Sequence, residues 1–373
     1  MMNIPLSAPD ITQAEIEAVT TVLHTSRLSL GPKLEEFEHA MAQYIGVPHA
    51  VAVSSGTAGL HLCICALDIG EGDEVIVPSF TFIAAANAIH YERAMPVFVD
   101  IDPATLNLDP AKIEAAITPR TRAILAVHTF GVPANMQVIL EIARRRNLLI
   151  IEDACEAIGA EYHGSRAGSF GDAAVFAFYP NKQITTGEGG VIVTRNATLA
   201  QRMRALRNQG RYESDDWLQH SELGYNYRLS EINCALGIEQ IKRIESILAQ
   251  RAGVAHAYHE RLRNQPLILP PLELPQARIS WFVYVIRLRP EFNQAHRDAI
   301  LKTLTSQGIG CARYFAPIHL QPAYAAWKNT HLPVTESESA RTIALPFFNR
   351  ITAAQQDYVC EKLAHALETL DRR

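Results

Sequence analysis

The sequence lacks the features of a membrane, nucleic-acid-binding or exported protein. Charged residues make up 20% of its 373 residues and the formal net charge is −5, so no basic field for nucleic acid is present. No uninterrupted apolar run reaches the length of a membrane helix, and Met1–Asp10 has no charged leader followed by an apolar stretch. We therefore expect a cytosolic protein that binds neither nucleic acid nor membrane.

Clustered cysteines and a nucleotide-binding loop are also missing. The six cysteines are scattered, with no CxxC pair and no Cys/His cluster at zinc spacing. Reduced, mostly buried thiols and no metal site are the expectation. The chain has no GxxxxGK[ST] loop either, so nucleoside triphosphate binding is not supported.

What is present is a series of alternating strand-like and helix-like segments over the first half of the chain. Leu148–Glu152 is almost wholly apolar, as expected for a strand buried on both faces. The other expected strands are Val51–Ser55, Glu74–Pro78, Pro96–Asp100, Arg122–His128, Ala173–Phe178 and Gly190–Thr194. Helical patterns lie between several of them, at Thr57–Leu67, Ile83–Tyr91 and Met136–Arg145. This βαβ alternation predicts an α/β fold, with a mostly parallel sheet flanked by helices.

The pattern changes near residue 230. Glu231–Leu248 predicts one long amphipathic helix, and Gln355–Leu370 a terminal helix. Phe282–Leu288 and Ile309–Tyr314 are strand-like. We therefore expect a large α/β domain over residues 1–245 and a smaller α+β domain over residues 246–373.

Lys182 is the first residue with chemical interest, because it follows a strand and precedes the glycine-rich turn Thr185–Gly190. Lysine is the amine that forms Schiff bases with carbonyl cofactors, and glycines let a cofactor approach the backbone closely. A lysine in a hairpin loop is more often a solvated charge. The position of Lys182 alone therefore does not decide between the two interpretations.

Asp153 ends a buried apolar strand, where open α/β sheets bind their ligands. A carboxylate at this place can keep a pyridinium nitrogen protonated, which makes the ring an electron sink. The alternative is an aspartate that caps a following helix.

Two further segments suit a phosphorylated, flat ligand. Ser54–Gly59 lies between a strand and a helix, and backbone N–H groups at a helix N-terminus attract phosphate. Phe82 follows the strand that ends at Pro78, and an aromatic side chain there can cover a flat ring. Each segment also has an ordinary structural explanation, namely a common helix start and core packing.

The order and spacing of these segments resemble the DegT/DnrJ/EryC1/StrS family of fold-type-I pyridoxal 5′-phosphate (PLP) enzymes, the nucleotide-sugar aminotransferases. The resemblance extends from Pro5-Leu6-Ser7 to Leu345-Pro346-Phe347. It rests mainly on five blocks: Ser55–Ala58, Gly72–Pro78, Glu152–Ala154, Lys182 with Thr185–Gly190, and Gly224–Arg228.

The resemblance implies a role for each matching residue. Lys182 would hold PLP and later move a proton, and Asp153 would contact the pyridine nitrogen. The implied cofactor-binding residues are Gly56, Thr57, Phe82, Asp153, Glu156, Lys182 and Asn226. Asn226 matches an asparagine that reaches the phosphate in the neighbouring subunit, which implies a homodimer with shared active sites. The implied substrate contacts are Leu30, Tyr314 and His319.

Two positions depart from the usual family pattern. Ala177 stands where a phosphate-binding serine is usual, so one phosphate contact is missing or supplied elsewhere. Glu156 stands where glutamine or histidine is usual, and its carboxylate would repel the cofactor's phenolate oxygen. We expect Glu156 to be protonated, paired with a cation or turned outward.

The implied reaction is the transfer of an amino group from L-glutamate to a keto-sugar of a nucleoside-diphosphate sugar, in amino-sugar, surface-polysaccharide or glycoside biosynthesis. Carbon 4 is the favoured position. One alternative is a PLP-dependent sugar dehydratase, although such family members replace the lysine with histidine or carry an iron–sulfur cluster. Another is a regulatory protein that binds PLP or a sugar nucleotide without turnover.

Overall fold

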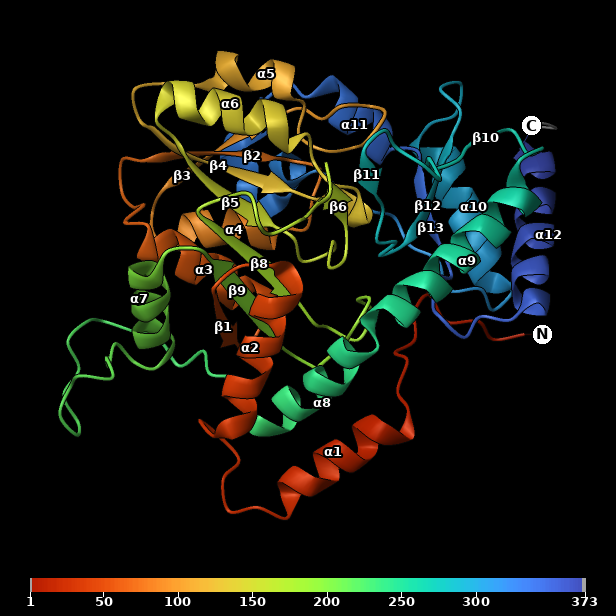
Figure 1. The fold of residues 1–373 in the computed structure, drawn as a ribbon. Coiled ribbons are helices and arrows are strands. Elements are labelled where there is room, and N and C mark those ends of the chain that lie inside the picture. Colours follow the sequence, from red (N-terminus) through yellow and green to blue (C-terminus); the bar gives the residue numbers. More distant parts are fainter. Residues whose placement is uncertain (1, 371–373) are drawn as a thin grey trace.

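The computed structural model describes residues 2–370, and a seven-stranded sheet lies at the centre of its larger part (Figure 1). The strand order is β1-β9-β8-β5-β4-β2-β3. All neighbours are parallel except β9, which runs antiparallel to both β1 and β8. The strands are β1 (His49–Val53), β2 (Glu74–Pro78), β3 (Met95–Val99), β4 (Thr121–Val127), β5 (Leu149–Asp153), β8 (Ala173–Ala177) and β9 (Gly190–Thr194).

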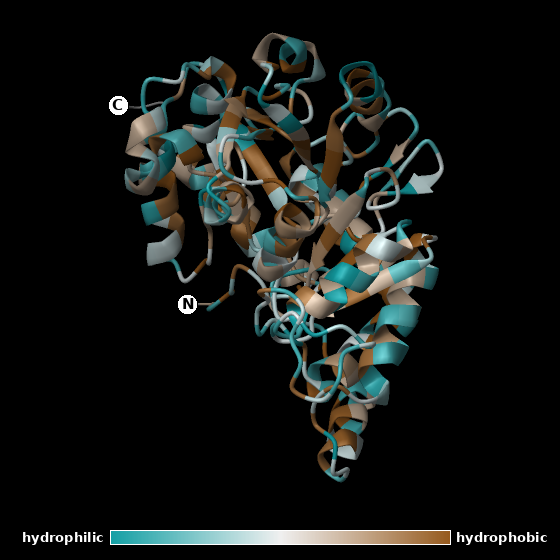
Figure 2. Ribbon diagram, turned by 90° about the vertical axis from the view of Figure 1, so that its left-hand side faces the viewer, coloured by the Kyte–Doolittle hydropathy of each residue, from teal (hydrophilic) through white to brown (hydrophobic). Residues whose placement is uncertain are grey.

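Helices cover both faces of this sheet, because its strands are apolar on both sides. Val51 and Val53 face one hydrophobic cluster, whereas Ala50 and Ala52 face another. The first cluster contains side chains of α3 (Gly56–Ala66), α4 (Ala84–Tyr91) and α7 (Ala197–Arg207). The opposite face is covered by α2 (Pro32–Ile45), α5 (Pro110–Ala116), α6 (Met136–Arg146) and α8 (Glu231–Lys242). In Figure 2 the strands are accordingly mostly hydrophobic, and the outer helices are mixed.

The C-terminal part contains a smaller antiparallel sheet with helices packed against it. Its strand order is β10-β12-β13, formed by β10 (Leu267–Ile268), β12 (Tyr284–Leu288) and β13 (Thr342–Leu345). Its helices are α9 (Ile244–Leu262), α10 (Gln294–Ser306), α11 (Pro333–Ser339) and α12 (Ala353–Leu370). A third sheet joins β11 (Ala277–Arg278) to β6 (Glu161–Tyr162) and β7 (Ser165–Arg166).

The N-terminal segment packs on this C-terminal part. Ile4 belongs to the same hydrophobic cluster as Tyr284 and Leu363, and its N–H donates to the Gly308 carbonyl at 2.9 Å. The helix α1 (Gln13–Leu23) then leads back along α8 to the large sheet (Figure 1). The domain boundary expected between residues 245 and 246 stays a prediction. It does not account for Ile4, which belongs to residues 1–245 but packs on the C-terminal part.

Two expected elements are wrong. The helix expected over Glu231–Leu248 is two helices, because α8 ends at Lys242 and α9 begins at Ile244. The strand expected over Ile309–Tyr314 is irregular, with only isolated bridges from Ile309 to Ile4 and from Ala312 to Ala344. Within residues 2–370, no helix combines the length and apolar character needed to cross a membrane.

Candidate active site

A cavity of about 480 Å³ opens at the carboxyl ends of the central strands. Val127, Asp153 and Ala177 line it, and they are the last residues of β4, β5 and β8. This edge is where open α/β sheets place their ligands. The remaining lining residues include Ser55, Gly56, Thr57, Thr81, Phe82, Cys155, Glu156, Tyr179, Asn181, Lys182, Glu188, Phe282, Tyr314 and Phe315.

Lys182 lies between β8 and β9, and its amine enters the cavity. Its Nζ is 3.5 Å from the Glu156 Oε1 and 3.9 Å from the centre of the Phe282 ring. The side chain is largely buried. The buried amine therefore meets one carboxyl group and one aromatic face, which is not the environment of a solvated surface lysine.

Asp153 lines the same cavity as Lys182. Its Oδ1 accepts a hydrogen bond from the Cys155 N–H at 3.1 Å, as in a turn that leaves a strand. Cys155 lines the cavity too, and burial holds the pKa of its thiol well above the ordinary value. The end of β5 and the residues just after it therefore present a carboxyl group and a thiol to the cavity.

The start of α3 forms another wall. Ser55 caps the helix by accepting a hydrogen bond from the Ala58 N–H at 3.1 Å, so Gly56 and Thr57 open the first turn. A Cβ atom on Gly56 would lie 2.7 Å from the Cβ of Ala177. Only glycine fits here, and the free N–H groups of the first turn provide a site for an anion.

Glu156 points inward, so of the three expected alternatives the outward orientation does not apply and the pairing with a cation does. Its Oε2 accepts a hydrogen bond from the Phe130 N–H at 2.9 Å, while Oε1 faces Lys182. Burial raises the pKa of the Glu156 carboxyl, and the nearby Lys182 amine opposes this rise. The carboxyl is held in place between a backbone donor and a cation.

Asn181 and Phe282 are cavity residues that the sequence did not reveal. The Oδ1 of Asn181 is buried and has no hydrogen-bond partner among residues 2–370. A polar atom in this condition is suited to a ligand. Phe282 approaches from the C-terminal part, about a hundred positions along the chain, and no local pattern could have indicated its contact with Lys182.

Three predicted site residues do not line this cavity. His319 is fully buried, with its Nδ1 2.7 Å from the Ser79 Oγ. Leu30 is 41% exposed near the start of α2. Asn226 is exposed and bridges to Asn208 outside the cavity of its own chain. Tyr314, in contrast, lines the cavity.

One group of side chains outside the cavity has the composition of a metal site. The ligand atoms of His61, Cys65 and Glu92 lie within 4.8 Å of one another. His61 Nε2 is 2.7 Å from Glu92 Oε1, and the thiol of Cys65 donates to the same oxygen at 3.2 Å. Burial raises the pKa of Cys65 to about 12. These contacts explain the cluster as a hydrogen-bonded network, because its thiol is neutral and its polar atoms are partnered.

The cavity residues fit PLP. Lys182 supplies an amine for the carbonyl carbon, Asp153 a carboxylate for a pyridinium nitrogen, and the start of α3 a site for phosphate. Phe82, 61% exposed on the wall of the cavity, offers a face for a flat ring.

Comparisons with known proteins agree with this chemistry. The model of the DegT/DnrJ/EryC1/StrS aminotransferase family matches residues 9–364. The chain is 42% identical to GDP-perosamine synthase of Caulobacter vibrioides over 368 residues, 98% of each protein. DesV of S. venezuelae, solved with a ketimine intermediate, is 36% identical, with a TM-score of 0.90 over 99% of each chain.

A structure of the putative sugar aminotransferase Spr1654 from Streptococcus pneumoniae, in its PMP form, superposes with a TM-score of 0.95. It is 27% identical and covers the whole of both chains. The fold is therefore that of the fold-type-I PLP enzymes, the cofactor is PLP and the reaction is a transamination. The chain belongs to the DegT/DnrJ/EryC1/StrS aminotransferase family.

Proposed function

We propose that this transaminase moves the amino group of L-glutamate to the 4-keto position of a nucleoside-diphosphate sugar, with GDP-linked sugars as the first class to test. The observation that carries the proposal is a single cavity lined by Lys182, Asp153 and the start of α3. The acceptor class is supported by the relative named GDP-perosamine synthase, which matches 98% of this chain.

Each of the cavity residues has its own role in the proposed reaction. When bound, PLP supplies a carbonyl that takes up the amino group and a ring that delocalises the electrons of the donor's α-carbon. Lys182 would hold the cofactor and then carry the proton from the donor's α-carbon to C4′. Asp153 would keep the proton on the ring nitrogen. Gly56 and Thr57 would bind the phosphate through backbone N–H groups, and Phe82 would cover the ring.

Glu156 and Tyr314 complete the environment of Lys182. The Glu156 carboxyl lies 3.5 Å from the amine and can accept or return a proton there. Burial raises the pKa of the Tyr314 hydroxyl, which keeps it a neutral hydrogen-bond donor next to this carboxyl. Lys182 therefore shares its cavity with one carboxyl group and one hydroxyl donor.

We also propose a homodimer in which Asn226 contributes to the partner's site. Asn226 is exposed and lies away from the cavity of its own chain, which suits a residue that acts in another one. The same segment exposes Trp217 and Leu223, whose side chains are 81% and 89% accessible. Large apolar side chains gathered on one loop are typical of a subunit contact.

The alternatives make different predictions for one experiment. Purified protein with bound PLP is mixed with L-glutamate, and the cofactor's absorbance is followed. Conversion to the pyridoxamine form supports transamination, whereas an unchanged spectrum favours a protein that binds without turnover. A panel of GDP-, UDP- and dTDP-linked keto-sugars then identifies the acceptor. Water loss from the sugar without amination would favour a dehydratase, which the presence of Lys182 argues against.

A further inference from the structure

We propose that Arg251, a residue of α9 outside the cavity, is a positioning residue that holds Phe282 over the amine of Lys182. The inference rests on the proposed role of Lys182. Arg251 touches neither the lysine nor the cavity, so it acts through the segment Ser280–Phe282.

The guanidinium of Arg251 donates hydrogen bonds to two consecutive peptide groups. Its Nε donates to the Trp281 carbonyl and its Nη2 to the Phe282 carbonyl, both at 2.7 Å. The side chain is only 2% exposed, and its carbon Cζ lies 4.9 Å above the centre of the Phe347 ring. Such a planar fork fixes position and direction together, which a lysine ammonium cannot do.

Burial of this cation has a cost that its partners must offset. Removal from water lowers the pKa of Arg251 to about 9, and the distant Asp10 is the charge that opposes this effect. The direct partners are neutral carbonyl groups and the Asn349 amide, not a carboxylate. Because the buried guanidinium donates its hydrogen bonds to the carbonyl groups of Trp281 and Phe282, it fixes the position of the backbone at these two residues.

The segment Ser280–Phe282 has a backbone conformation that needs such support. Trp281 has φ of +50°, in the left-handed region that bulky residues rarely adopt. On its other side, Gln183 donates to the Ser280 Oγ at 3.0 Å, and the Ser280 N–H donates to the Gly131 carbonyl at 3.0 Å. Strained conformations persist only where the surroundings define them on several sides.

Phe282 carries the effect into the cavity. The centre of its ring lies 3.9 Å from the Lys182 Nζ, within the range of a cation–π contact. Arg251 binds the carbonyl of the same residue, so its guanidinium restrains the backbone from which the ring projects. The direction of the Lys182 amine is therefore set from α9.

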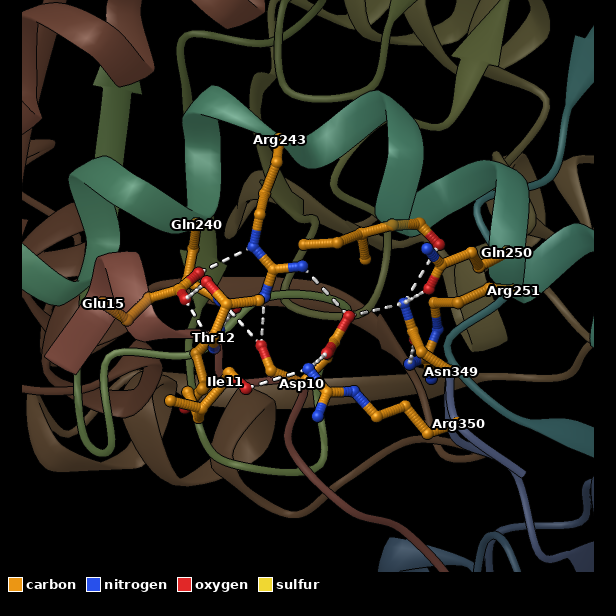
Figure 3. A network of polar contacts seen from close by, with 12 residues as sticks. Asp10, Ile11, Thr12, Glu15, Gln240, Arg243, Gln250, Arg251, Asn349 and Arg350 are labelled. Atoms are coloured by element: carbon orange, nitrogen blue, oxygen red, sulfur yellow. Dashed lines mark hydrogen bonds and ion pairs between the residues drawn. The ribbon is translucent and has the colours of Figure 1, made fainter. Parts of the chain in front are cut away.

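Arg251 is itself held by a network that Figure 3 shows. Asn349 Oδ1 accepts from the Arg251 Nη1 at 3.0 Å, and the Asn349 amide donates to Gln250 at 3.2 Å and to Asp10 at 3.4 Å. Asp10 also pairs with Arg350 at 2.7 Å. The N-terminal segment, α9 and the residues before α12 thus meet behind the segment Ser280–Phe282.

The test measures how fast PLP attaches to the full-length protein after its cofactor has been removed. Attachment is followed by absorbance and mapped to Lys182 by borohydride reduction and mass spectrometry. Arg251→Lys and Phe282→Leu should each slow attachment by about 3- to 30-fold, because the Phe282 ring then no longer orients the amine that attacks the carbonyl of the cofactor. The double variant should be no slower than the slower single variant, because both changes break the same path.

Arg297→Lys is the matched control. Arg297 is also buried and donates to a backbone carbonyl, that of Ser339 at 2.7 Å, but away from the cavity. It should change attachment by less than about twofold. Thermal denaturation establishes that each variant is folded at the temperature of the assay.

Separate outcomes identify which idea fails. Attachment that persists in Lys182→Ala overturns the proposed function. Normal attachment in Phe282→Leu, with none in Lys182→Ala, overturns the role of Arg251 alone. Independent, multiplying effects of Arg251→Lys and Phe282→Leu also overturn it. If Arg251→Lys does not fold, Asn349→Ala loosens the same guanidinium and should slow attachment in the same direction.

Discussion

At the scale of single residues, Glu156 is the most unusual side chain of the cavity. Its carboxyl is buried against the Lys182 amine and the Phe130 N–H. A glutamate whose pKa is raised on folding disfavours the folded state once the pH exceeds the ordinary value near 4.3, because its charged form is better solvated in the unfolded chain. Glutamine carries no charge and escapes this penalty.

We therefore expect Glu156→Gln to stabilise the cofactor-free protein at neutral pH, by about 1 kcal/mol. The gain should shrink as the pH falls and vanish below about 4, where the glutamate is protonated in both states. Chemical denaturation at a series of pH values measures this difference. Glu36→Gln, at an exposed glutamate, is the control and should show little change. A gain that does not depend on pH would contradict the explanation.

Gly56 is the second residue of the cavity whose substitution gives a testable prediction. Gly56→Ala adds a Cβ that would lie 2.7 Å from the Cβ of Ala177 and 2.9 Å from the Cys155 Sγ, so the start of α3 must shift. We expect PLP affinity to fall about tenfold or more, measured by titration of the cofactor-free protein.

The control for this change is Gly253→Ala, in the middle of α9. A Cβ on Gly253 meets nothing within 4 Å. This variant should gain about 0.5–1 kcal/mol of stability from helix propensity and bind PLP normally. Equal PLP affinity in both variants would mean that the α3 start does not bind the phosphate.

The residues that could be predicted from the sequence are those at strand ends and helix starts. Asp153 ends β5, and Gly56, Phe82 and Lys182 lie within five residues after the end of a strand. All four line one cavity. His319 does not, because its imidazole is taken up by Ser79 behind the cavity wall. Whether a side chain faces a cavity or the core behind it depends on tertiary packing, which no local pattern records.

At the scale of elements, the contact between α8 and α2 stands out. Glu231, the first residue of α8, accepts hydrogen bonds from the N–H groups of Gly31, Lys33 and Leu34 at 2.8–3.0 Å. One carboxylate therefore caps the start of another helix, where an anion is favoured by the helix dipole. A cap supplied from two hundred positions away joins the two helices into one unit.

Glu231→Gln should accordingly lower the free energy of unfolding by about 2–4 kcal/mol, because charge-assisted bonds to buried donors are lost. Denaturant unfolding measures the loss. Glu239→Gln removes only an exposed pair with Lys242 on the same helix and should cost less than about 0.5 kcal/mol. A similar loss in both variants would show that the cap contributes nothing special.

Element boundaries were predictable where the local pattern is complete. Glu74–Pro78 and Gly190–Thr194 are strands over the expected residues. The break between α8 and α9 at Arg243 was not predictable. Arg243 departs from helical geometry at the point where its side chain forms ion pairs with Asp10 and Glu15 (Figure 3). Those partners come from the N-terminal segment, and a helical period in the sequence contains no information about them.

At the scale of the whole molecule, the proposed sharing of active sites can be tested by mixing. Lys182→Ala and Asn226→Ala should each be almost inactive as pure variants, the first without the amine and the second without a phosphate contact from the partner. Mixed dimers combine an intact Lys182 and an intact partner Asn226 in one of their two sites. Unfolding and refolding the two variants together should therefore restore about a quarter of the wild-type activity.

Two controls accompany the mixture. The sedimentation coefficient establishes that both variants form dimers, and each variant refolded alone should remain inactive. A mixture as inactive as its components would show that Asn226 does not act in the partner's site. If Asn226→Ala alone is fully active, the residue has no part in the reaction.

The position of β9 in the sheet has a consequence for how the protein reaches its native state. β9 pairs with β1, so residues about 140 positions apart must meet before the sheet is complete, and Lys182 lies in the connection that leads into β9. Pairing over such sequence separations is slow, because the entropy of closing a long loop is lost before the contacts form. Covalent capture of the cofactor during refolding should then report the last stage of assembly, and a nascent chain released before residue 194 would be unable to retain it.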